Sequence, residues 1–182
     1  MKSLIQFVVC SSLLLLCAVS AGAQVVNSGV QTVSLNATLN DSITLTLSSN
    51  SVSFLLTAGS ATNSGSTGVT ATTTWVSRPG KDVSVLAYFS SATSALSDGG
   101  GSNIPSSAFS ISNNGGAFLP LSNTVAFGGA NAGRQIFTVK VTGQNKTGTH
   151  ADNMLFNIDL SALPQLPAGT YTGTLNIQAQ VI

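Results

Sequence analysis

The end of the chain alternates between apolar and polar residues. From position 171 to position 181 the odd positions are apolar or small, and the even positions carry Thr, Asn or Gln. A period of two is typical of a β-strand with one buried and one solvated face. The sequence therefore predicts a terminal strand that starts at Tyr171. The residues expected on its inner face are Tyr171, Gly173, Leu175, Ile177, Ala179 and Val181.

The residues before this strand predict a tyrosine corner. The stretch Leu166-Pro-Ala-Gly-Thr-Tyr171 places a tyrosine at the start of a late strand, directly after a short Pro- and Gly-containing loop. In Greek-key sandwiches the hydroxyl of such a tyrosine hydrogen-bonds back to the preceding loop. We therefore expect an immunoglobulin-like Greek-key β-sandwich, with Gly169 and Tyr171 at the corner.

The composition agrees with an all-β fold. The chain contains no Glu and few Lys, and its polar positions are mostly Ser, Thr, Asn and Gly. With six Lys and Arg against five Asp, the net charge is +1. A nucleic acid or an anionic membrane surface is bound through a basic patch, and this chain lacks the charge for one. We therefore expect neither as a partner.

The first residues are typical of a secretory signal. Lys2 precedes an apolar run, and Ala21-Gly-Ala23 supplies the small residues that a signal peptidase requires. We expect residues 1–23 to be removed, the protein to pass through a periplasm, and the mature chain to be secreted or held at the cell surface. Cleavage removes Cys10 and Cys17, the only cysteines, so no disulfide is expected in the mature domain.

Further alternating segments between turn signals predict a sandwich of short strands. The residues around Arg78-Pro-Gly-Lys81 are expected to form a hairpin with a type II turn, and Asn113-Asn-Gly-Gly116 a second hairpin turn. Trp75 is expected in the core. Residues 24–39 are expected to form an N-terminal extension or a first strand, and residues 40–182 a single domain. The expected strands cover residues 33–39, 43–47, 51–57, 69–76, 82–89, 108–112, 117–121, 125–127, 135–141, 154–160 and 171–181.

Residue types that support catalysis are scarce. The one histidine, His150, is expected in a solvated loop, although Asp152 could orient it towards a serine. Asp98 lies among glycines but lacks the regular series of oxygen ligands found in calcium loops. We therefore expect no enzyme activity, no metal site and no cofactor.

The two ends of the chain resemble those of a known family. Val33-Ser-Leu35-Asn-Ala37-Thr-Leu39, with the Asn-Asp-Ser-Ile43 that follows, and the carboxyl-terminal Ala168-Gly-Thr-Tyr171-Thr-Gly173 are similar to the ends of fimbrial major subunits of the colonisation-factor type. They also resemble the spore coat protein U-like pilins of archaic chaperone–usher systems. The resemblance covers about thirty residues at the two ends.

The resemblance implies an incomplete sandwich that is completed by a strand from another subunit. The donated strand would come from residues 24–39 and insert Val33, Leu35, Ala37 and Leu39. The acceptor groove would be bordered by the terminal strand, through Gly169, Tyr171, Leu175, Ile177, Ala179 and Val181. The implied partners are further copies or related subunits, a periplasmic chaperone and an outer-membrane usher, and the implied use is adhesion.

Two other hypotheses remain open from the residues alone. Residues 33–39 could be the first strand of a complete, monomeric sandwich that binds carbohydrate or protein, and an exposed aromatic patch at Trp75, Tyr88 or Phe89 would support it. A secreted hydrolase would require His150 or a pair of aspartates to converge in a pocket.

Overall fold

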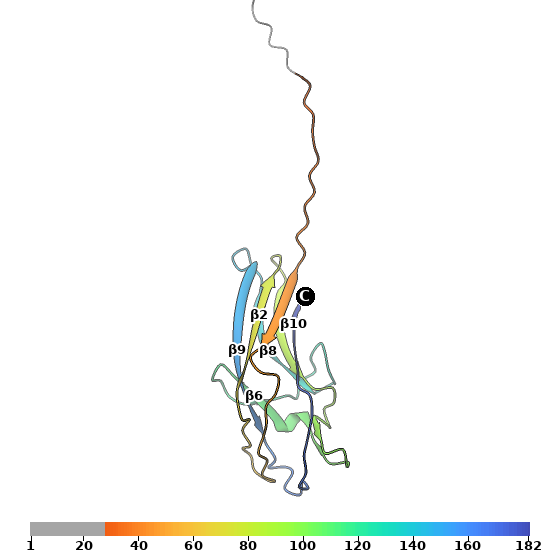
Figure 1. Cartoon of the computed structure of the whole chain (residues 1–182), viewed down its shortest axis with the longest axis vertical. Helices are drawn as coiled ribbons and strands as arrows, with labels where there is room; N and C mark the ends of the chain where they lie inside the picture. Colours follow the sequence, from red (N-terminus) through yellow and green to blue (C-terminus); the bar gives the residue numbers. More distant parts are fainter. Residues whose placement is uncertain (1–27) are drawn as a thin grey trace, which may run out of the picture. The chain divides into compact units, whose positions relative to one another are not determined.

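A computed structural model describes residues 28–182 of the protein (Figure 1). The expected signal peptide, residues 1–23, lies outside these residues. The chain divides into two units, Met1–Ala37 and Thr38–Ile182. In the first unit, residues 28–37 are exposed and contain no helix or strand. The strand expected at residues 33–39 is therefore not formed in this single chain.

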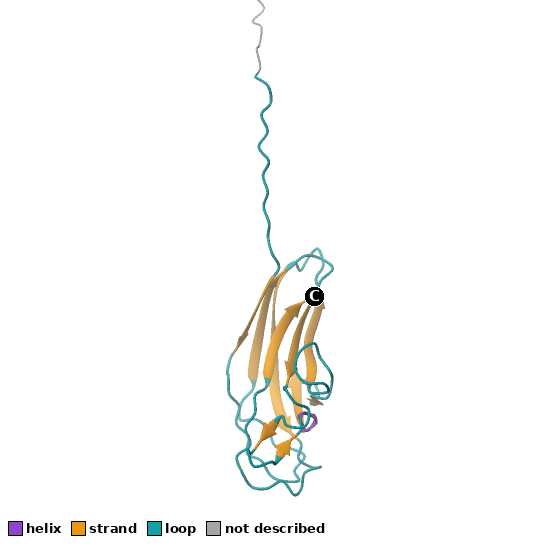
Figure 2. Cartoon of the chain, turned by 90° about the vertical axis from the view of Figure 1, so that its right-hand side faces the viewer, coloured by secondary structure: helices purple, strands orange, loops and turns teal. Residues whose placement is uncertain are grey.

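The second unit is an all-β sandwich of antiparallel sheets (Figure 2), as the sequence predicts. The larger sheet has the strand order β1 (Ser42–Leu47), β2 (Val69–Val76), β9 (Thr147–Ile158), β6 (Phe109–Asn113), β7 (Leu119–Pro120). The smaller sheet has the order β10 (Asn176–Val181), β3 (Asp82–Tyr88), β8 (Gly133–Lys140). A short ribbon pairs β4 (Leu96–Ser97) with β5 (Asn103–Ile104), and a single 3-10 turn, η1, covers Ser106–Ala108.

The connection between β2 and β3 is a turn, but the expected hairpin is wrong. Gly80 has φ of +94°, as the third position of a type II turn requires. However, β2 belongs to the larger sheet and β3 to the smaller one. The turn crosses between sheets because its backbone bonds to the β8–β9 connection: Gly80 N–H donates to Val141 O at 2.9 Å, and Ser77 N–H to Lys146 O at 2.7 Å.

The second expected hairpin is confirmed. β6 and β7 pair in antiparallel register, and the turn between them places Asn114 and Gly115 at φ of 51° and 76°. Both values lie in the left-handed region, which Asn and Gly tolerate best. The turn closes with a hydrogen bond from Gly116 N–H to the carbonyl of Asn113 at 2.9 Å.

Several strand boundaries differ from the expected ones. Residues 51–57 form only an isolated bridge, Phe54 with Gly65, and residues 125–127 form no strand. The terminal strand begins at Asn176 instead of Tyr171, because Thr172 pairs with Ser97 of the β4–β5 ribbon and not with β3. β9 begins at Thr147, within the expected loop, since eight of its residues pair with the whole length of β2.

Two apolar clusters fill the space between the sheets. At the end where β1 begins, Trp75, Val83 and Val141 pack together, and Trp75 is 5% exposed, which confirms its expected place in the core. A larger cluster around Phe109 fills the other end. Buried Thr73 lies between Ala71 of the larger cluster and Trp75 of the smaller one along β2. On β2 a polar residue therefore separates the two clusters, whereas on β3 the residue between them, Val85, is apolar and buried.

Candidate functional site

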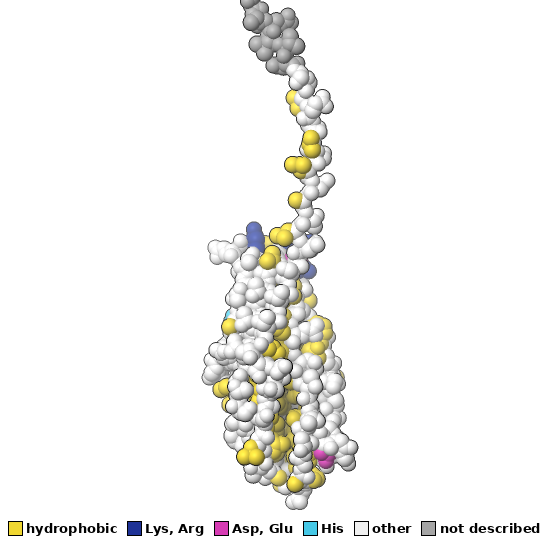
Figure 3. All heavy atoms as spheres, viewed as in Figure 1, with side chains coloured by type: hydrophobic (Ala, Val, Ile, Leu, Met, Phe, Trp, Pro, Cys, Tyr) yellow, Lys and Arg dark blue, Asp and Glu magenta, His cyan; other side chains and the backbone are white. Residues whose placement is uncertain are grey.

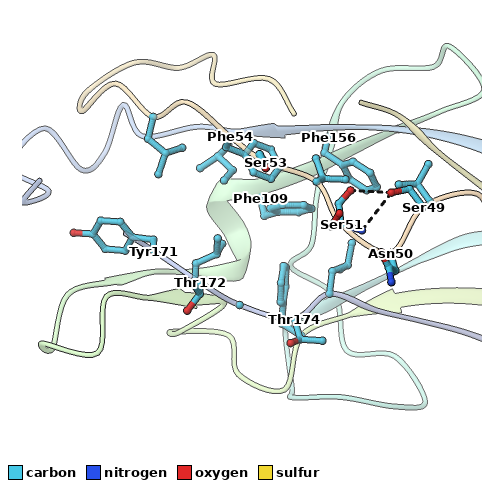
Figure 4. A pocket seen from close by; sticks show the side chains of 18 of the residues that line it. Ser49, Asn50, Ser51, Ser53, Phe54, Phe109, Phe156, Tyr171, Thr172 and Thr174 are labelled. Atoms are coloured by element: carbon cyan, nitrogen blue, oxygen red, sulfur yellow. Dashed lines mark hydrogen bonds between the residues drawn. The ribbon is translucent and has the colours of Figure 1, made fainter. Parts of the chain in front are cut away.

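An open groove of about 690 Å³ lies beside the segment that leads into β10. One wall is formed by residues 49–56, which follow β1, and the other by residues 169–177 (Figure 4). Ser49 and Ser51 hydrogen-bond within the first wall, where the Ser49 hydroxyl donates to the carbonyl of Ser51 at 3.0 Å. Tyr171, Thr172 and Thr174 come from the second wall.

The floor of the groove is aromatic and aliphatic. Phe109 lies at its centre, with ring centroids 5.2 Å from Phe89, 5.8 Å from Phe54 and 5.8 Å from Phe156. In Figure 3, hydrophobic side chains form a band along this face of the sandwich. Since apolar surface is driven out of water by about 25 cal/mol per Å², an open groove with such a floor favours an apolar occupant. Leu47, Val69 and Ile158 also line it.

The groove lies next to the ends of two strands that each have an unpaired edge: Leu47 of β1 and Ile177 of β10 line it. β1 pairs only with β2, and β10 pairs only with β3, within the part of the chain that the structure describes. All six residues of β10 are only partly buried. An edge with free N–H and C=O groups is a template for a further strand. The apolar floor of the groove therefore lies next to strand edges to which an added strand could bond.

The groove is closed at one end and open at the other. Near the start of β1, β1 and β10 approach each other, and Ile43 and Val181 pack against the same cluster of Trp75, Val83 and Val141. After Leu47 the chain diverges from β1 and β10, and the residues that line the groove continue as far as Gly169. A strand that enters the groove must therefore continue out of it at the Gly169 end.

A tyrosine corner shapes the open end. The hydroxyl of Tyr171 donates to the carbonyl of Pro167 at 2.9 Å, as expected for this corner. Thr172 exchanges two backbone hydrogen bonds of 2.9 Å with Ser97, which anchors this wall to the β4–β5 ribbon. A Cβ atom at Gly173 would collide with the carbonyl oxygen of Ala95. Only glycine therefore allows the wall to lie this close to the ribbon.

The structure brings four of the six expected acceptor residues to the groove: Gly169, Tyr171, Leu175 and Ile177. Ala179 pairs with Val85 of β3, and Val181 packs against the other apolar cluster, so neither lines the groove. The expected donor residues Val33, Leu35 and Leu39 are 82%, 88% and 86% exposed. Ala37 is exposed as well.

Sequence reasoning did not anticipate the first wall or the floor. Residues 51–57 have the composition of a strand, and their alternation of Val52, Phe54 and Leu56 gives no sign that they form the rim of a groove. Phe109 could be identified as apolar, but its central position depends on the pairing of β6 with β9. Neither feature is encoded locally.

The loop expected around His150 is wrong, although 34% of its side chain remains exposed to solvent. It lies on β9 opposite Thr73, and its ring stacks on Phe137 of the other sheet, with centroids 3.8 Å apart and an interplanar angle of 12°. Its Nε2 lies 3.2 Å from Oδ1 of the fully buried Asp152. The strand starts earlier than expected, so the histidine is held between the sheets.

This histidine is not part of a nucleophilic triad in the described part of the chain. Asp152 Oδ1 also accepts hydrogen bonds from Asn113 Nδ2 at 2.8 Å and from Asn114 Nδ2 at 3.4 Å. No serine or threonine hydroxyl in residues 28–182 hydrogen-bonds to the ring of His150. A triad requires that contact. The geometry instead indicates a structural polar cluster that connects β6, β9 and the turn after β6.

The aromatic residues that a binding surface would need are mostly buried. Trp75 and Phe89 are 5% and 3% exposed. Tyr88 is partly buried, and its hydroxyl donates to Gln178 Oε1 at 2.7 Å. These three residues do not form an exposed aromatic patch, so the feature that would support a monomeric binding module is not found at them.

Asp98 forms an ordinary turn. Its Oδ1 accepts hydrogen bonds from the backbone N–H groups of Gly100 at 2.8 Å and Ser102 at 2.9 Å, and these bonds lower its pKa. Within residues 28–182, no cluster of His, Cys, Asp and Glu has the size needed to hold a metal ion. None of the helices in that range has the length and apolar character to cross a membrane.

Comparison with known proteins gives no relative: no protein-family model, no curated protein and no solved structure matches the chain significantly.

Proposed function

We propose that this protein is an exported structural subunit of a surface fibre, which polymerises when one copy donates residues 33–39 to the groove of the next. The supporting observation is the combination of an open apolar groove beside the unpaired edge of β10 with an exposed alternating segment in the same chain. In this proposal the sandwich is an immunoglobulin-like one that lacks its last strand. A donated strand completes the sheet, and its side chains fill the core.

The closed end of the groove determines the direction of the donated strand. The donor's own domain follows residue 39, so that end of the strand must lie at the open end of the groove, near Gly169. Val33 then lies at the closed end, near Ile177. The donated strand therefore runs antiparallel to β10, which is the more favourable way to extend an antiparallel sheet.

This direction also supports donation between copies. Leu39 is three residues from Ser42, so its Cα lies within about 11 Å of the start of β1, which is at the closed end. In the antiparallel direction Leu39 must instead reach the open end. β1 alone separates the two ends by about 20 Å. A chain therefore cannot fill its own groove in this direction, whereas a second copy can.

The spacing of apolar residues suggests a register. Every second donor residue from 33 to 39 is apolar, which gives four inserted side chains. In antiparallel order these match every second residue of the acceptor wall from 177 back to 171. Val33 then pairs with Ile177, Leu35 with Leu175, Ala37 with Gly173, and Leu39 with Tyr171. The smallest donor side chain meets the glycine where the backbone of Ala95 approaches most closely. Burying each Val or Leu contributes about 1.5–3 kcal/mol.

The partners follow from this mechanism. A groove with an apolar floor must be covered until the next subunit arrives, because an open edge strand invites aggregation. A periplasmic chaperone would provide that cover, and an outer-membrane usher would exchange it for a donated strand. The protein would act in adhesion as part of the fibre, without catalysis or a cofactor.

The test compares the mature chain, residues 24–182, with two single variants. Leu35→Asp places a charge on the inserted face, whereas Asn36→Asp makes a carboxylate at the neighbouring position on the solvated face. We expect multimers that withstand mild detergent from the unchanged chain and from Asn36→Asp, and monomers from Leu35→Asp, by size exclusion with light scattering. Equal, monomeric behaviour of all three chains would overturn the proposal.

A further inference from the structure

The charged residues of the sandwich are separated between its two ends. Figure 3 shows Lys and Arg side chains at the end where β1 begins and an acidic side chain at the opposite end. Arg78 and Lys81 lie in the β2–β3 turn, Lys140 ends β8, and Lys146 precedes β9. Backbone hydrogen bonds join these segments: Ser77 N–H to Lys146 O at 2.7 Å, and Val141 N–H to Lys81 O at 2.7 Å. We name these four cationic residues the basic end.

The basic end retains a positive charge despite its two carboxylates. Asp41 lies 3.5 Å from Arg78 Nε, and Asp82 begins β3. Four cationic side chains against two carboxylate side chains leave a net side-chain charge of about +2. The remaining cation of residues 28–182, Arg134, pairs with Ala87 near the other end of β3, so it lies towards the opposite end and offsets part of the negative charge there.

The opposite end carries carboxylates. Asp98 lies at the mouth of the groove, where a Cβ atom on Gly169 would be 3.8 Å from its Cβ. Asp159 follows the last residue of β9 and is exposed. Hydrogen bonds from Gly100 N–H to Asp98, and from Ser161 to Asp159, hold the pKa of each carboxyl below its usual value. We name Asp98 and Asp159 the acidic end.

The proposed strand donation places these two ends against each other. The donor's residue 39 leaves the acceptor groove beside Gly169 and Asp98, and two residues later Asp41 is bonded to the β2–β3 turn by Arg78 N–H at 3.1 Å. The basic end of the donor therefore follows directly after the strand that fills the acceptor. Leu39 is only two positions before Asp41 in the sequence, and Asp41 bonds to the β2–β3 turn.

We propose that the basic end of each copy docks on the acidic end of the copy that accepts its strand, so that a second copy of this chain is recognised by charge as well as by the apolar strand. This inference rests on the proposed function. The donated segment itself carries no charge between residues 24 and 40, so the two contributions are separable. The charges would steer the encounter and fix the orientation of neighbouring domains.

The test measures the rate of assembly at low salt for charge-reversed variants of the mature chain. Asp98→Lys is expected to slow assembly about tenfold, because steering by opposite charges accelerates association by at least that factor. In about 1 M salt, where the screening length is about 3 Å, the differences should disappear.

The matched control is Asp82→Lys, which makes the same change in net charge at the basic end. We expect it to leave the rate unchanged or to raise it. An equal loss in Asp98→Lys and Asp82→Lys, or no loss in either, would overturn the docking of the two ends.

Binding of a peptide of residues 28–40 distinguishes a failure of the charge-guided docking from a failure of the proposed strand donation. The acceptor is the full mature chain with Leu35→Asp, which keeps its groove but donates poorly. The uncharged peptide should bind equally well with and without Asp98→Lys. If the peptide does not bind and the unchanged chain does not assemble, strand donation itself is wrong. If both occur but Asp98→Lys has no effect on assembly, only the charge-guided docking is wrong.

Discussion

The hydroxyl group of Tyr171 donates a hydrogen bond to the carbonyl oxygen of Pro167, four residues earlier, at 2.9 Å. This bond closes the loop at the open end of the groove, where Gly169 and Tyr171 line the wall. Replacing Tyr171 by Phe removes the hydroxyl and keeps the ring. We expect a loss of about 1 kcal/mol in the free energy of unfolding, as for a typical hydrogen bond, measured by urea denaturation. An unchanged midpoint would show that the corner contributes nothing to stability.

Gly173 should tolerate no side chain. Because a Cβ atom there would collide with the carbonyl of Ala95, Gly173→Ala must displace either the groove wall or the β4–β5 ribbon. We expect a destabilisation of about 1–3 kcal/mol, the usual cost of overpacking. Gly143→Ala is the control, since its Cβ would meet no atom within 4 Å. Thermal melting of both variants measures the difference, and similar melting temperatures would contradict this account of the close approach.

The buried carboxylate of Asp152 should be important for folding. It accepts hydrogen bonds from Asn113 at 2.8 Å and Asn114 at 3.4 Å and faces His150 at 3.2 Å. Asp152→Ala removes the buried acceptor of these hydrogen bonds, and we expect a loss of about 2–4 kcal/mol. The matching change at the exposed Asp159 is expected to cost well under half as much. Chemical denaturation of the two variants provides the comparison.

Asp98 should contribute stability that depends on pH. Hydrogen bonds from Gly100 and Ser102 N–H lower its pKa below the ordinary value of 3.8. Since the folded pKa lies below the unfolded one, the contribution is fully present above the unfolded value and is lost as pH falls through the folded value. Asp98→Ala should therefore melt below the unchanged chain near pH 6, and the gap should narrow below about pH 4. A gap that is constant between about pH 6 and pH 2 would contradict this.

The proposed register can be tested by cross-linking. Residues 24–182 contain no cysteine, so every disulfide formed by the double variant Leu35→Cys with Leu175→Cys in this part of the chain must join introduced cysteines. Directly opposed residues on neighbouring strands have Cβ atoms about 4.5–5.5 Å apart, near enough for a disulfide after a small adjustment. We expect oxidation to give covalent multimers of this variant, and far fewer of the control variant Leu35→Cys with Val181→Cys. Non-reducing electrophoresis reports the ladder. Equal ladders would indicate that the register is wrong.

The sequence is sufficient for the fold class but not for the arrangement of strands into sheets. Alternation and turn residues identify the β6–β7 hairpin, because Asn114 and Gly115 specify the turn locally. The same reasoning fails at Arg78 and Lys81, where the turn is correct but the two strands join different sheets. Strand partners depend on long-range contacts that a local pattern does not contain.

In the candidate site, too, locally encoded features can be predicted from the sequence, and features that depend on long-range contacts cannot. The exposed apolar alternation of residues 33–39 and the tyrosine corner at Tyr171 can be predicted, since each is a local pattern. The groove itself cannot be predicted, because it arises where β1 and β10 are left without partners and residues 49–56 diverge. At His150 a local pattern is misleading: the Gly- and Thr-rich sequence around it suggests a loop, but these residues form a strand because they pair with β2.

A groove that opens at one end only has a consequence for the length of any polymer built on it. Every chain of subunits would end in one unfilled groove and one undonated segment, so its two tips are chemically different and growth can be stopped at each separately. A copy that lacks residues 24–39 would accept but never donate, and would terminate one tip. A copy with an obstructed groove would terminate the other. Small amounts of either terminator, mixed with intact subunits, should therefore shorten the polymers in proportion to the dose.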